Sequence, residues 1–235
     1  MSKIITLDGP ASSGKTTVGY GLAQKLGYQF VDSGSIYRAG CYYLLRNGLP
    51  FDNDENAAHT FNLLDIRFLS TEQGQKVFVF NEDVTQFLGT PEVTAIVPVV
   101  GGRRFVREVV KSKQRDLGSH EDTVMTGRDI GTEIFPDAQV KYFITASPEV
   151  RAYRRFMQLT QDGQLANFDD LLQKIIQRDH QDSTREVSPF RMPDGAVVID
   201  TSNLSVESVV NKLYYNAIFE VNKEGQIRPS GRERI

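Results

Sequence analysis

The residues with the clearest chemistry follow a short apolar run near the N-terminus. Residues 9–16 read GPASSGKT and match the pattern G-x-x-x-x-G-K-[ST] at every fixed position. Its glycines permit backbone angles that turn N–H groups toward a phosphate, and the start of the following helix adds to this anion site. Lys15 is expected to reach the β- and γ-phosphates of a nucleotide, and the Thr16 hydroxyl to ligate Mg²⁺. The predicted nucleotide-binding residues are Gly9, Pro10, Ala11, Ser12, Ser13, Gly14, Lys15, Thr16 and Thr17.

Arginines form the second candidate group, because phosphoryl transfer needs several fixed cations around the travelling charge. Those beside predicted strand ends or on the later helices are Arg38, Arg107, Arg128, Arg151, Arg154, Arg155, Arg178 and Arg185. The spacing of residues 151, 154 and 155 predicts that they share one helix face. Any one arginine also fits a solvated charged face. The set as a whole is typical of an ATP-dependent kinase, whereas a regulatory GTPase requires an N-K-x-D segment, which this sequence lacks.

A further polar cluster follows the second predicted strand. Residues 32–38 read DSGSIYR and come directly after an apolar run that ends at Val31. Open α/β sheets hold ligands at the carboxyl ends of their strands, so we expect this segment to face a ligand. Asp32 or Ser33 can also serve simply as the cap of the next helix. Capping gives no role to Arg38, which lies about one turn into that helix.

An alternation of strands and helices must position these residues. Apolar runs predict strands over 4–7 and 28–31, each followed by a helix, and the first helix begins near Lys15 and stops at Gly27. Later strands are predicted at 123–126, 140–144 and 197–200, and a last helix at 206–221. This order predicts an α/β fold with a central parallel β-sheet flanked by helices.

The pattern changes between residues 60 and 90, where two strand-like runs flank the turn-prone sequence EQGQ and predict a small β-rich insertion. The segment from Pro91 to about Leu117 is predicted to be helical and is basic. The predicted organisation is a single domain over 1–222, with a core of 1–59 and 91–222, the insertion at about 60–90 and a mobile lid at about 148–165. The polar tail, residues 223–235, is predicted to be disordered.

Composition restricts the class of protein. The 235 residues are 40% hydrophobic and 24% charged, as in a soluble globular domain, and the net charge of −3 argues against a nucleic-acid partner. Without a signal peptide or an apolar run of membrane-spanning length, we expect a cytoplasmic monomer with no membrane partner. The single cysteine, Cys41, is expected to be a buried reduced thiol. The three histidines lack metal-ligand spacing.

Further segments make the chain resemble the bacterial cytidylate kinases. Besides the phosphate loop and DSGSIYR, these are VRE at 106–108, GRDIGT at 127–132, FPDA at 135–138 and RDxxDxxR at 178–185, in the order found in that family. The phosphate loop alone is shared by many proteins, but the combination is far more specific. The resemblance runs from about residue 3 to residue 222. It implies a P-loop kinase fold whose β-rich insertion binds the nucleoside monophosphate (NMP) and whose lid is helical.

The activity implied by this resemblance is transfer of the γ-phosphoryl group of ATP to CMP or dCMP, with Mg²⁺. Arg38 and Arg128 would hold the acceptor phosphate. The cytosine edge would be read by Arg107, Asp129 and Arg185. Ser33 and Asp182 would face the sugar, with Arg178 nearby. The implied substrate-binding residues are Ser33, Tyr37, Arg38, Arg107, Arg128, Asp129, Arg178, Asp182 and Arg185, and the implied catalytic residues are Lys15, Arg128 and the lid residues Arg154 and Arg155.

Elementary chemistry agrees with these roles, because cytosine offers an amino donor beside two acceptors and a phosphate suits the bidentate fork of arginine. Asp129 has the alternative role of orienting Arg128 through an ion pair, and Asp182 that of a general base. An acceptor that is already anionic needs little general-base catalysis, so positioning and electrostatic stabilisation are expected to contribute most to catalysis. The family usually has a serine at Pro98, an arginine at Gln181 and A-P-L in place of residues 188–190.

Two other functions remain open on the sequence alone. One is a P-loop kinase for another acceptor, such as UMP, AMP or a non-nucleotide. The other is a nucleotide-binding switch that hydrolyses slowly and signals to a protein. The arginines supplied in cis and the missing N-K-x-D segment disfavour the switch, whose ATP turnover should not respond to CMP.

Overall fold

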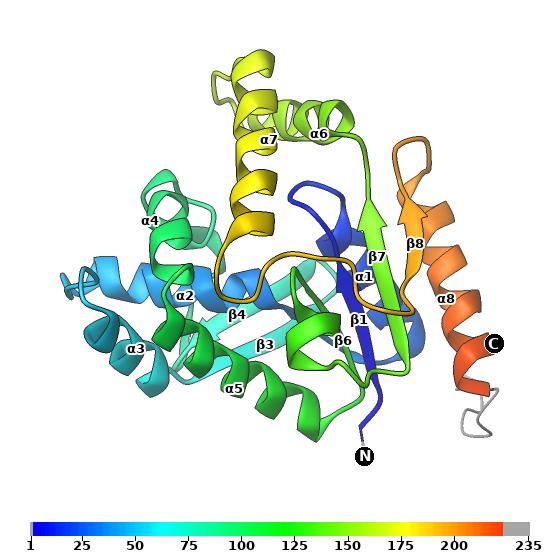
Figure 1. Ribbon diagram of the computed structural model, residues 1–235, viewed down its shortest axis with the longest axis horizontal. Helices are drawn as coiled ribbons and strands as arrows, with labels where there is room; N and C mark the ends of the chain where they lie inside the picture. The colour runs from blue at the N-terminus through cyan, green and yellow to red at the C-terminus, as the bar shows by residue number, and fades with distance from the viewer. Residues whose placement is uncertain (1, 223–235) are drawn as a thin grey trace.

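The computed structural model describes residues 2–222, which form a parallel sheet with helices on both faces (Figure 1). The five strands lie in the order β2-β6-β1-β7-β8, and every neighbouring pair is parallel. Their bounds are β1 Ile4–Asp8, β2 Gln29–Asp32, β6 Thr123–Gly127, β7 Val140–Thr145 and β8 Val197–Asp200. The predicted α/β class and all five predicted strands are confirmed. The expected tail at 223–235 lies outside the described residues.

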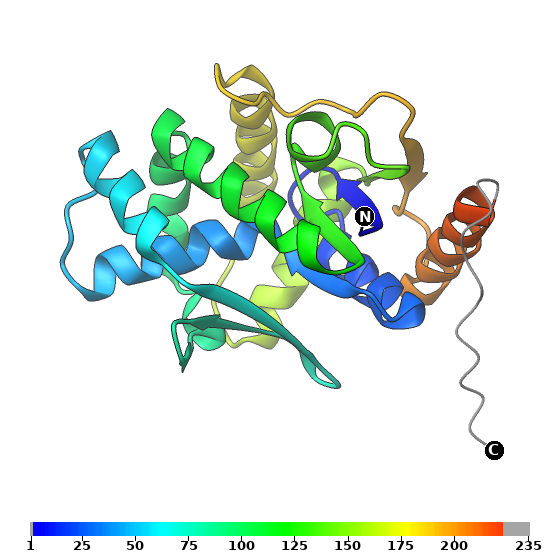
Figure 2. The same cartoon turned by 90° about the horizontal axis from the view of Figure 1, so that it is seen from below.

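Alternation of side chains along the strands divides the core into two clusters. Phe30 and Val124 pack with α1 (Lys15–Leu26) and α8 (Val206–Asn222), which cover one face of the sheet. Their neighbours Val31 and Met125 point the other way, toward α2 (Ser33–Arg46) and α5 (Arg104–His120). Adjacent strand residues face opposite sides, so a sheet buried on both faces needs continuous apolar runs like these. Figure 2 shows α8 and α5 on different sides of the strands.

The insertion holds a three-stranded antiparallel sheet of β3 (Ile66–Thr71), β4 (Gly74–Val79) and β5 (Glu82–Asp83). This agrees with the predicted β-rich character. A helix that was not predicted, α3 (Asp54–Leu63), precedes the sheet, and the short 3₁₀ helix η1 (Thr85–Phe87) follows it. The hairpin is fastened to the core, since Gln75 Nε2 donates to the carbonyl of Phe30 at 2.5 Å. The 60–90 boundary stays a prediction, and it falls inside α3.

The segment predicted to be helical from Pro91 to Leu117 is helical in the structure, and it holds two helices. The first, α4 (Pro91–Gly101), ends before Gly102, and α5 begins at Arg104. Arg103 between them has an extended backbone with ψ of 132°, which ends helical hydrogen bonding. After the break α5 packs chiefly against α3, while α4 packs on α2. Cys41 on α2 is fully buried, as expected.

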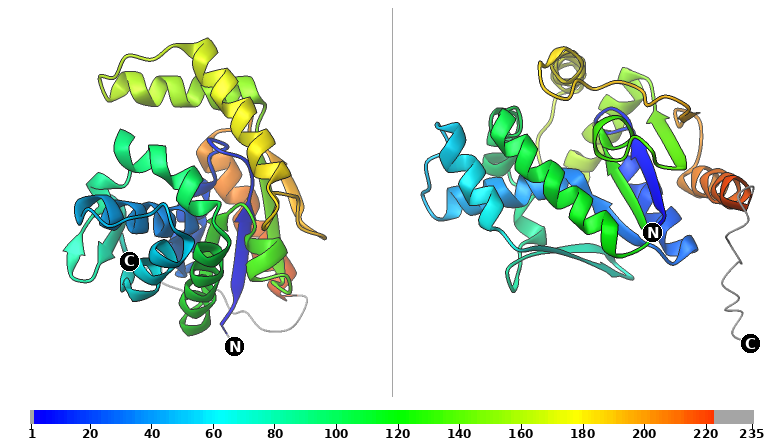
Figure 3. Two further views of the ribbon diagram at one scale, coloured as in Figure 1. Left: turned by 60° about the vertical axis from the view of Figure 1, so that its left-hand side comes forward. Right: turned by 60° about the horizontal axis from the view of Figure 1, so that its bottom comes forward.

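Two helices project above the carboxyl ends of the strands. They are α6 (Pro148–Gln161) and α7 (Phe168–Thr184), which meet at a turn and stand over the loop between β1 and α1 (Figure 3, left). Ser147 caps α6 by accepting from Val150 N, and Asn167 caps α7 by accepting from Asp170 N. Among the described residues, no helix has the length and apolar character needed to cross a membrane.

Candidate active site

The predicted phosphate loop connects β1 to α1 and is bonded through its carbonyl groups. Lys15 Nζ donates to the carbonyl of Pro10 at 2.7 Å, Arg151 Nη1 to that of Ala11 at 3.3 Å, and Thr201 Oγ1 to that of Ser13 at 3.1 Å. A loop held through its carbonyls can offer its N–H groups to an anion. At the first loop position only glycine fits, because a Cβ on Gly9 would lie 2.0 Å from the carbonyl oxygen of Ile144.

Lys15 lies inside the loop with only 8% of its surface exposed. Burial, and then the positive charge of Arg128, hold the pKa of Lys15 well below its usual value, and Arg178 acts in the same direction. Asp32 and Asp8 oppose them. A polyphosphate bound in the loop would add negative charge beside Lys15 and so favour its protonated form. Thr16 and Thr17 in the first turn of α1 are exposed at its mouth.

The segment after β2 supplies one side of the acceptor region. Asp32 caps α2 by accepting from Gly34 N at 3.2 Å, and its other oxygen pairs with Arg38 Nη2 at 2.5 Å. The carboxylate is therefore the helix cap considered on the sequence, and it also fixes Arg38, a pairing that the sequence did not predict. Ser33, in the first turn of α2, is 5% exposed.

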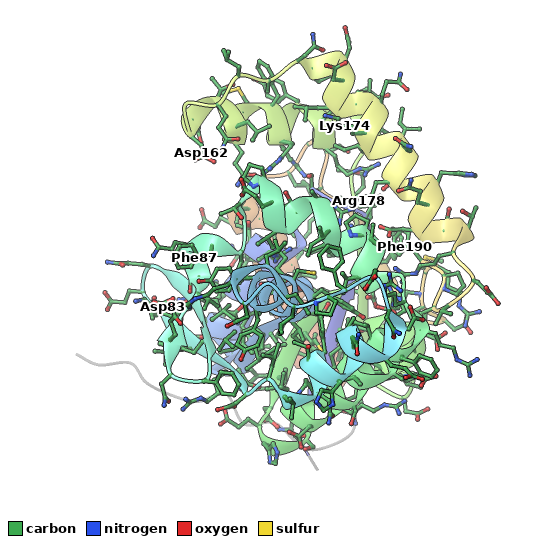
Figure 4. All side chains as sticks on the ribbon, turned by 90° about the vertical axis from the view of Figure 1, so that its left-hand side faces the viewer. Asp83, Phe87, Asp162, Lys174, Arg178 and Phe190 are labelled. Carbon is green, nitrogen blue, oxygen red and sulfur yellow. The ribbon has the colours of Figure 1, made fainter. Side chains whose placement is uncertain are left out.

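The opposite side of this region comes from the end of β6. Arg128 Nη1 donates to the carbonyl of Gly9 at 3.0 Å, and its Nε donates to Asp182 Oδ2 on α7 at 2.8 Å. One arginine thereby contacts the phosphate loop and the helix above it. Burial opposes ionisation of Asp182, but the charges of Arg128, Arg178 and Arg185 hold its pKa below the usual range. Arg178 is exposed on α7 and lies on the side of the helix nearest the body of the molecule (Figure 4).

Asp129 is held between two other arginines. Arg107 Nη1 donates to Asp129 Oδ2 at 2.9 Å, and Arg185 Nη2 lies 3.5 Å from the same oxygen. The guanidinium of Arg107 also covers the ring of Tyr37 at 5.7 Å. The structure therefore brings together the predicted residues Arg107, Asp129, Arg185 and Tyr37. The ion pair weighed between Asp129 and Arg128 is replaced by the pairs Asp129–Arg107 and Arg128–Asp182.

Two buried donors in this group are without acceptors. Arg107 Nε and Arg185 Nη2 make no hydrogen bond with any described residue. Buried polar atoms without partners are rare in folded proteins, and they often mark a place where a ligand completes the network. A flat heterocycle with ring acceptors beside an amino group would satisfy these donors and the carboxylate together.

The arginines of α6 do not act alike. Arg154 Nη1 donates to Thr201 Oγ1 at 2.9 Å and approaches the carbonyl of Ser13 at 3.4 Å, so it lies at the loop. Arg155 bonds instead to Gln158 on its own helix. Arg151, like Arg154, bonds to a carbonyl of the phosphate loop, but it is only 3% exposed and also forms a bidentate pair with Asp179 at 2.6 and 3.1 Å. Its buried pair fastens α6 to α7.

A cavity of about 680 Å³ adjoins the base of these helices. It is lined by Pro10 of the phosphate loop, Arg151, Asp179 and the stacked rings of Phe143 and Phe190. Sequence reasoning missed Asp179, Thr201 and the buried carboxylate of Asp8. A charge ending the otherwise apolar run IITLD was a usable signal for Asp8, whereas no local pattern points to Thr201.

Known proteins resemble the chain over most of its length. The family model described as cytidylate kinase matches residues 5–218. A cytidylate kinase of Bacillus subtilis (strain 168) is 41% identical over 209 residues, which cover 89% of this chain and 93% of the relative. That of Bacillus thuringiensis (strain Al Hakam) is 42% identical over the same shares. Among solved structures, a gluconokinase from Sinorhizobium meliloti 1021 aligns over 97% of this chain and 98% of its own, with 14% identity and a TM-score of 0.49. By its family model and its relatives, the chain belongs to the cytidylate kinase family.

Proposed function

We propose that this protein transfers the γ-phosphoryl group of ATP to CMP or dCMP, giving ADP and CDP or dCDP. The observation that carries the proposal is the seating of Asp129 between Arg107 and Arg185, next in sequence to an arginine that contacts the phosphate loop. The carboxylate that would read the base is then connected to the loop that would bind the phosphoryl donor, through the neighbouring residue Arg128. Family membership supports the same reaction.

ATP would bind with its phosphates in the loop at residues 9–17 and its β- and γ-phosphates beside Lys15. The Thr16 hydroxyl is exposed at the loop mouth and suits Mg²⁺, which keeps most of its ligands as water and substrate phosphate oxygens. When bound, Mg²⁺ would supply positive charge that offsets the charge developing on the transferring phosphoryl group. Arg154 and Arg155 on the lid would close over the transferring group. The boundaries of that lid, at about 148–165, stay a prediction.

CMP would bind with its phosphate between Arg38 and Arg128. Both guanidiniums are already oriented, by Asp32 and by Asp182, and such preorganisation lowers the entropy lost on binding. Ser33 and Asp182 would face the sugar, with Arg178 nearby. Arg107, Asp129 and Arg185 would read the base, beside Tyr37. Asp129 would accept from the exocyclic amine, and the two unpartnered arginine nitrogens would donate to the ring acceptors.

The reaction would rest on positioning and on cations rather than on a general base. The attacking oxygen belongs to a phosphate that is already anionic, so little proton transfer is needed. Asp182 pairs with Arg128, and its lowered pKa makes it a weak base. Its proposed part is to hold Arg128 and face the sugar. Monomeric action on free nucleotides is also part of this proposal.

The experiment is a coupled ADP-release assay with ATP and a panel of CMP, dCMP, UMP and AMP. The proposal expects ADP release to depend on the acceptor and kcat/KM to be highest for CMP or dCMP. The Lys15→Ala variant, purified in parallel, serves as the control for ADP released by contaminating enzymes. ATP turnover unaffected by CMP would overturn the kinase assignment, and a clear preference for UMP or AMP would overturn the acceptor.

A further inference from the structure

Asp8 is a buried carboxylate to which the proposed reaction assigns no role. It is the last residue of β1, it directly precedes Gly9, and it has 0% exposure. β1 is the middle strand of the sheet, so Asp8 lies at the carboxyl end of the strand that leads into the phosphate loop. An ionised carboxylate in such a place is retained only where hydrogen bonds satisfy it.

Both oxygens of Asp8 accept backbone hydrogen bonds from the segment after β6. Ile130 N donates to Oδ1 at 2.8 Å and Gly131 N donates to Oδ2 at 2.7 Å. These residues begin the turn η2 (Ile130–Ile134), a π-helical turn that follows Arg128 and Asp129 directly. The close approach requires Gly131, because a Cβ there would lie 2.8 Å from Thr6 Oγ1 and 3.1 Å from Asp8 Oδ2.

The residue that follows Asp8 also contacts the segment between β6 and this turn. The carbonyl of Gly9 accepts from Arg128 Nη1 at 3.0 Å. Asp8, the last residue of β1, and Gly9, the first residue of the phosphate loop, thus hold the two amides after Asp129 and the side chain of Arg128. Asp8 and Gly9 therefore position the side chains that would bind the acceptor phosphate and the base. The same segment continues into the phosphate loop, which would bind the donor phosphates.

We propose that Asp8 is a positioning residue: its two hydrogen bonds fix the Arg128–Asp129 segment against the phosphate loop and so set recognition of the acceptor nucleotide. This inference rests on the proposed function. It assigns Asp8 no contact with either substrate. The carboxylate form is needed, since only an ionised Asp places a separate acceptor oxygen, with no donor beside it, opposite each of the two N–H groups, whereas Asn has one acceptor oxygen and a donor NH₂.

The charges facing Asp8 come from Asp129 and from Lys15 of α1. Burial raises the pKa of Asp8 to about 6, with Asp129 acting in the same direction, while the two amides and Lys15 lower it. Protonation would turn one acceptor into an O–H donor that faces an N–H group. The hydrogen bonds, and with them the position of the segment, should therefore weaken as pH falls through this value.

The test compares Asp8→Asn with a matched control, Asp122→Asn. Asp122 also accepts a backbone hydrogen bond, from Lys3 N at 2.7 Å, but it precedes β6 at the other end of the strand. For Asp8→Asn we expect kcat/KM for CMP to fall about tenfold or more, the effect of losing one hydrogen bond to a charged group. The ratio of kcat/KM for CMP to that for UMP should shrink. The dissociation constant for a non-hydrolysable ATP analogue, measured by calorimetry, should stay within about twofold of the wild-type value. That change is smaller than the loss expected for one hydrogen bond to a charged group.

A general structural role would lower ATP and CMP affinity together, or lower the melting temperature and leave the CMP/UMP ratio unchanged, and either result would overturn the proposal. If the Asp8→Asn variant does not fold, the pH dependence of the wild-type enzyme tests the proposal instead. The ratio of kcat/KM for CMP to kcat/KM for UMP should decrease as the pH is lowered from 7.5 to 5.5. Titration of the acceptor phosphate does not affect this ratio, because both substrates carry the same phosphate. A ratio constant with pH contradicts the proposal. Wild type that does not phosphorylate CMP overturns the proposed function itself.

Discussion

Arg107 and Asp129 form an ion pair with 2.9 Å between Nη1 and Oδ2, and only 10% and 11% of their side chains are exposed. Arg185 approaches the same oxygen of Asp129 at 3.5 Å. Both arginines thus contact Oδ2. If Asp129 reads the base as proposed, Oδ1 would accept from the exocyclic amine, and the two arginines would set the orientation of the carboxylate before the base binds, which favours discrimination.

Substitution of Asp129 by Asn should narrow the preference for CMP over UMP, mainly through loss of CMP activity. A carbonyl facing the carboxylate costs about 1–3 kcal/mol, so wild-type kcat/KM for CMP should exceed that for UMP by about tenfold or more. Asn can donate to the uracil carbonyl and removes this opposition. The measurement is the ratio of the two kcat/KM values before and after substitution. An equal loss for both substrates would mean that Asp129 only orients its arginines.

Replacement of Lys15 by Ala should abolish most turnover and leave the fold intact. Lys15 lies within the loop, and its loss removes the ammonium expected at the transferring phosphate. Such a contact is worth on the order of 10²–10⁴ in rate. The control is Lys25→Ala in the last turn of the same helix, where Lys25 bonds to Asn211 at 2.6 Å. Near-normal kcat in folded Lys15→Ala enzyme would refute the phosphate-loop assignment.

The two lid arginines should affect kcat more than the KM for CMP. Contacts made mainly in the transition state give this kinetic pattern. Arg154 already lies at the loop, bonded to Thr201, whereas Arg155 bonds to Gln158 and must change partner to reach the phosphates. Steady-state kinetics of Arg154→Ala and Arg155→Ala test this. If both variants raised the KM for CMP and kept kcat, the residues would belong to the acceptor site.

Asp8 should make the free energy of unfolding depend on pH. Its pKa is raised from 3.8 to about 6, so the folded state binds more protons than the unfolded state between these values. Burying the charged carboxylate costs more than its two hydrogen bonds return, so the protonated form is favoured in the folded state. The resulting stability is fully present below about pH 4 and is lost as pH rises through about 6, by about 3 kcal/mol. Urea unfolding of wild type and Asp8→Asn from pH 4 to pH 7 should show the wild type losing stability relative to the variant. Parallel curves would contradict the raised pKa.

Local patterns predicted the sheet and the phosphate loop well, because each depends on residues close in sequence. The glycines, Lys15 and the flanking apolar runs define the loop without reference to the rest of the chain. Helix α3 was missed although Asn53, which accepts from Glu55 and Asn56, is a recognisable helix cap. The helical character of residues 91–117 was predicted, but not the break between α4 and α5 at Gly102 and Arg103.

The partners of the site residues could not be read from the sequence. Arg151 and Asp179 are 28 residues apart, and Arg128 and Asp182 are 54 apart. Motif spacing names such residues but gives no distances between elements. Asp8 bonds to amides more than a hundred positions away, and backbone amides carry no residue-type signal. Only the packing of β6 beside β1 brings these groups together.

The central place of β1 has a consequence for synthesis on the ribosome. Both neighbours of this first strand come late, since Ile4 pairs with Thr123 in β6 and Ile5 with Val140 in β7. A nascent chain therefore carries an unpaired apolar strand until more than half of the protein has emerged. Long-range parallel pairing is slow to form, and exposed strand edges promote aggregation. The donor and acceptor halves of the site can be joined only after β6 has left the exit tunnel, so nucleotide binding should appear late and abruptly as the chain lengthens.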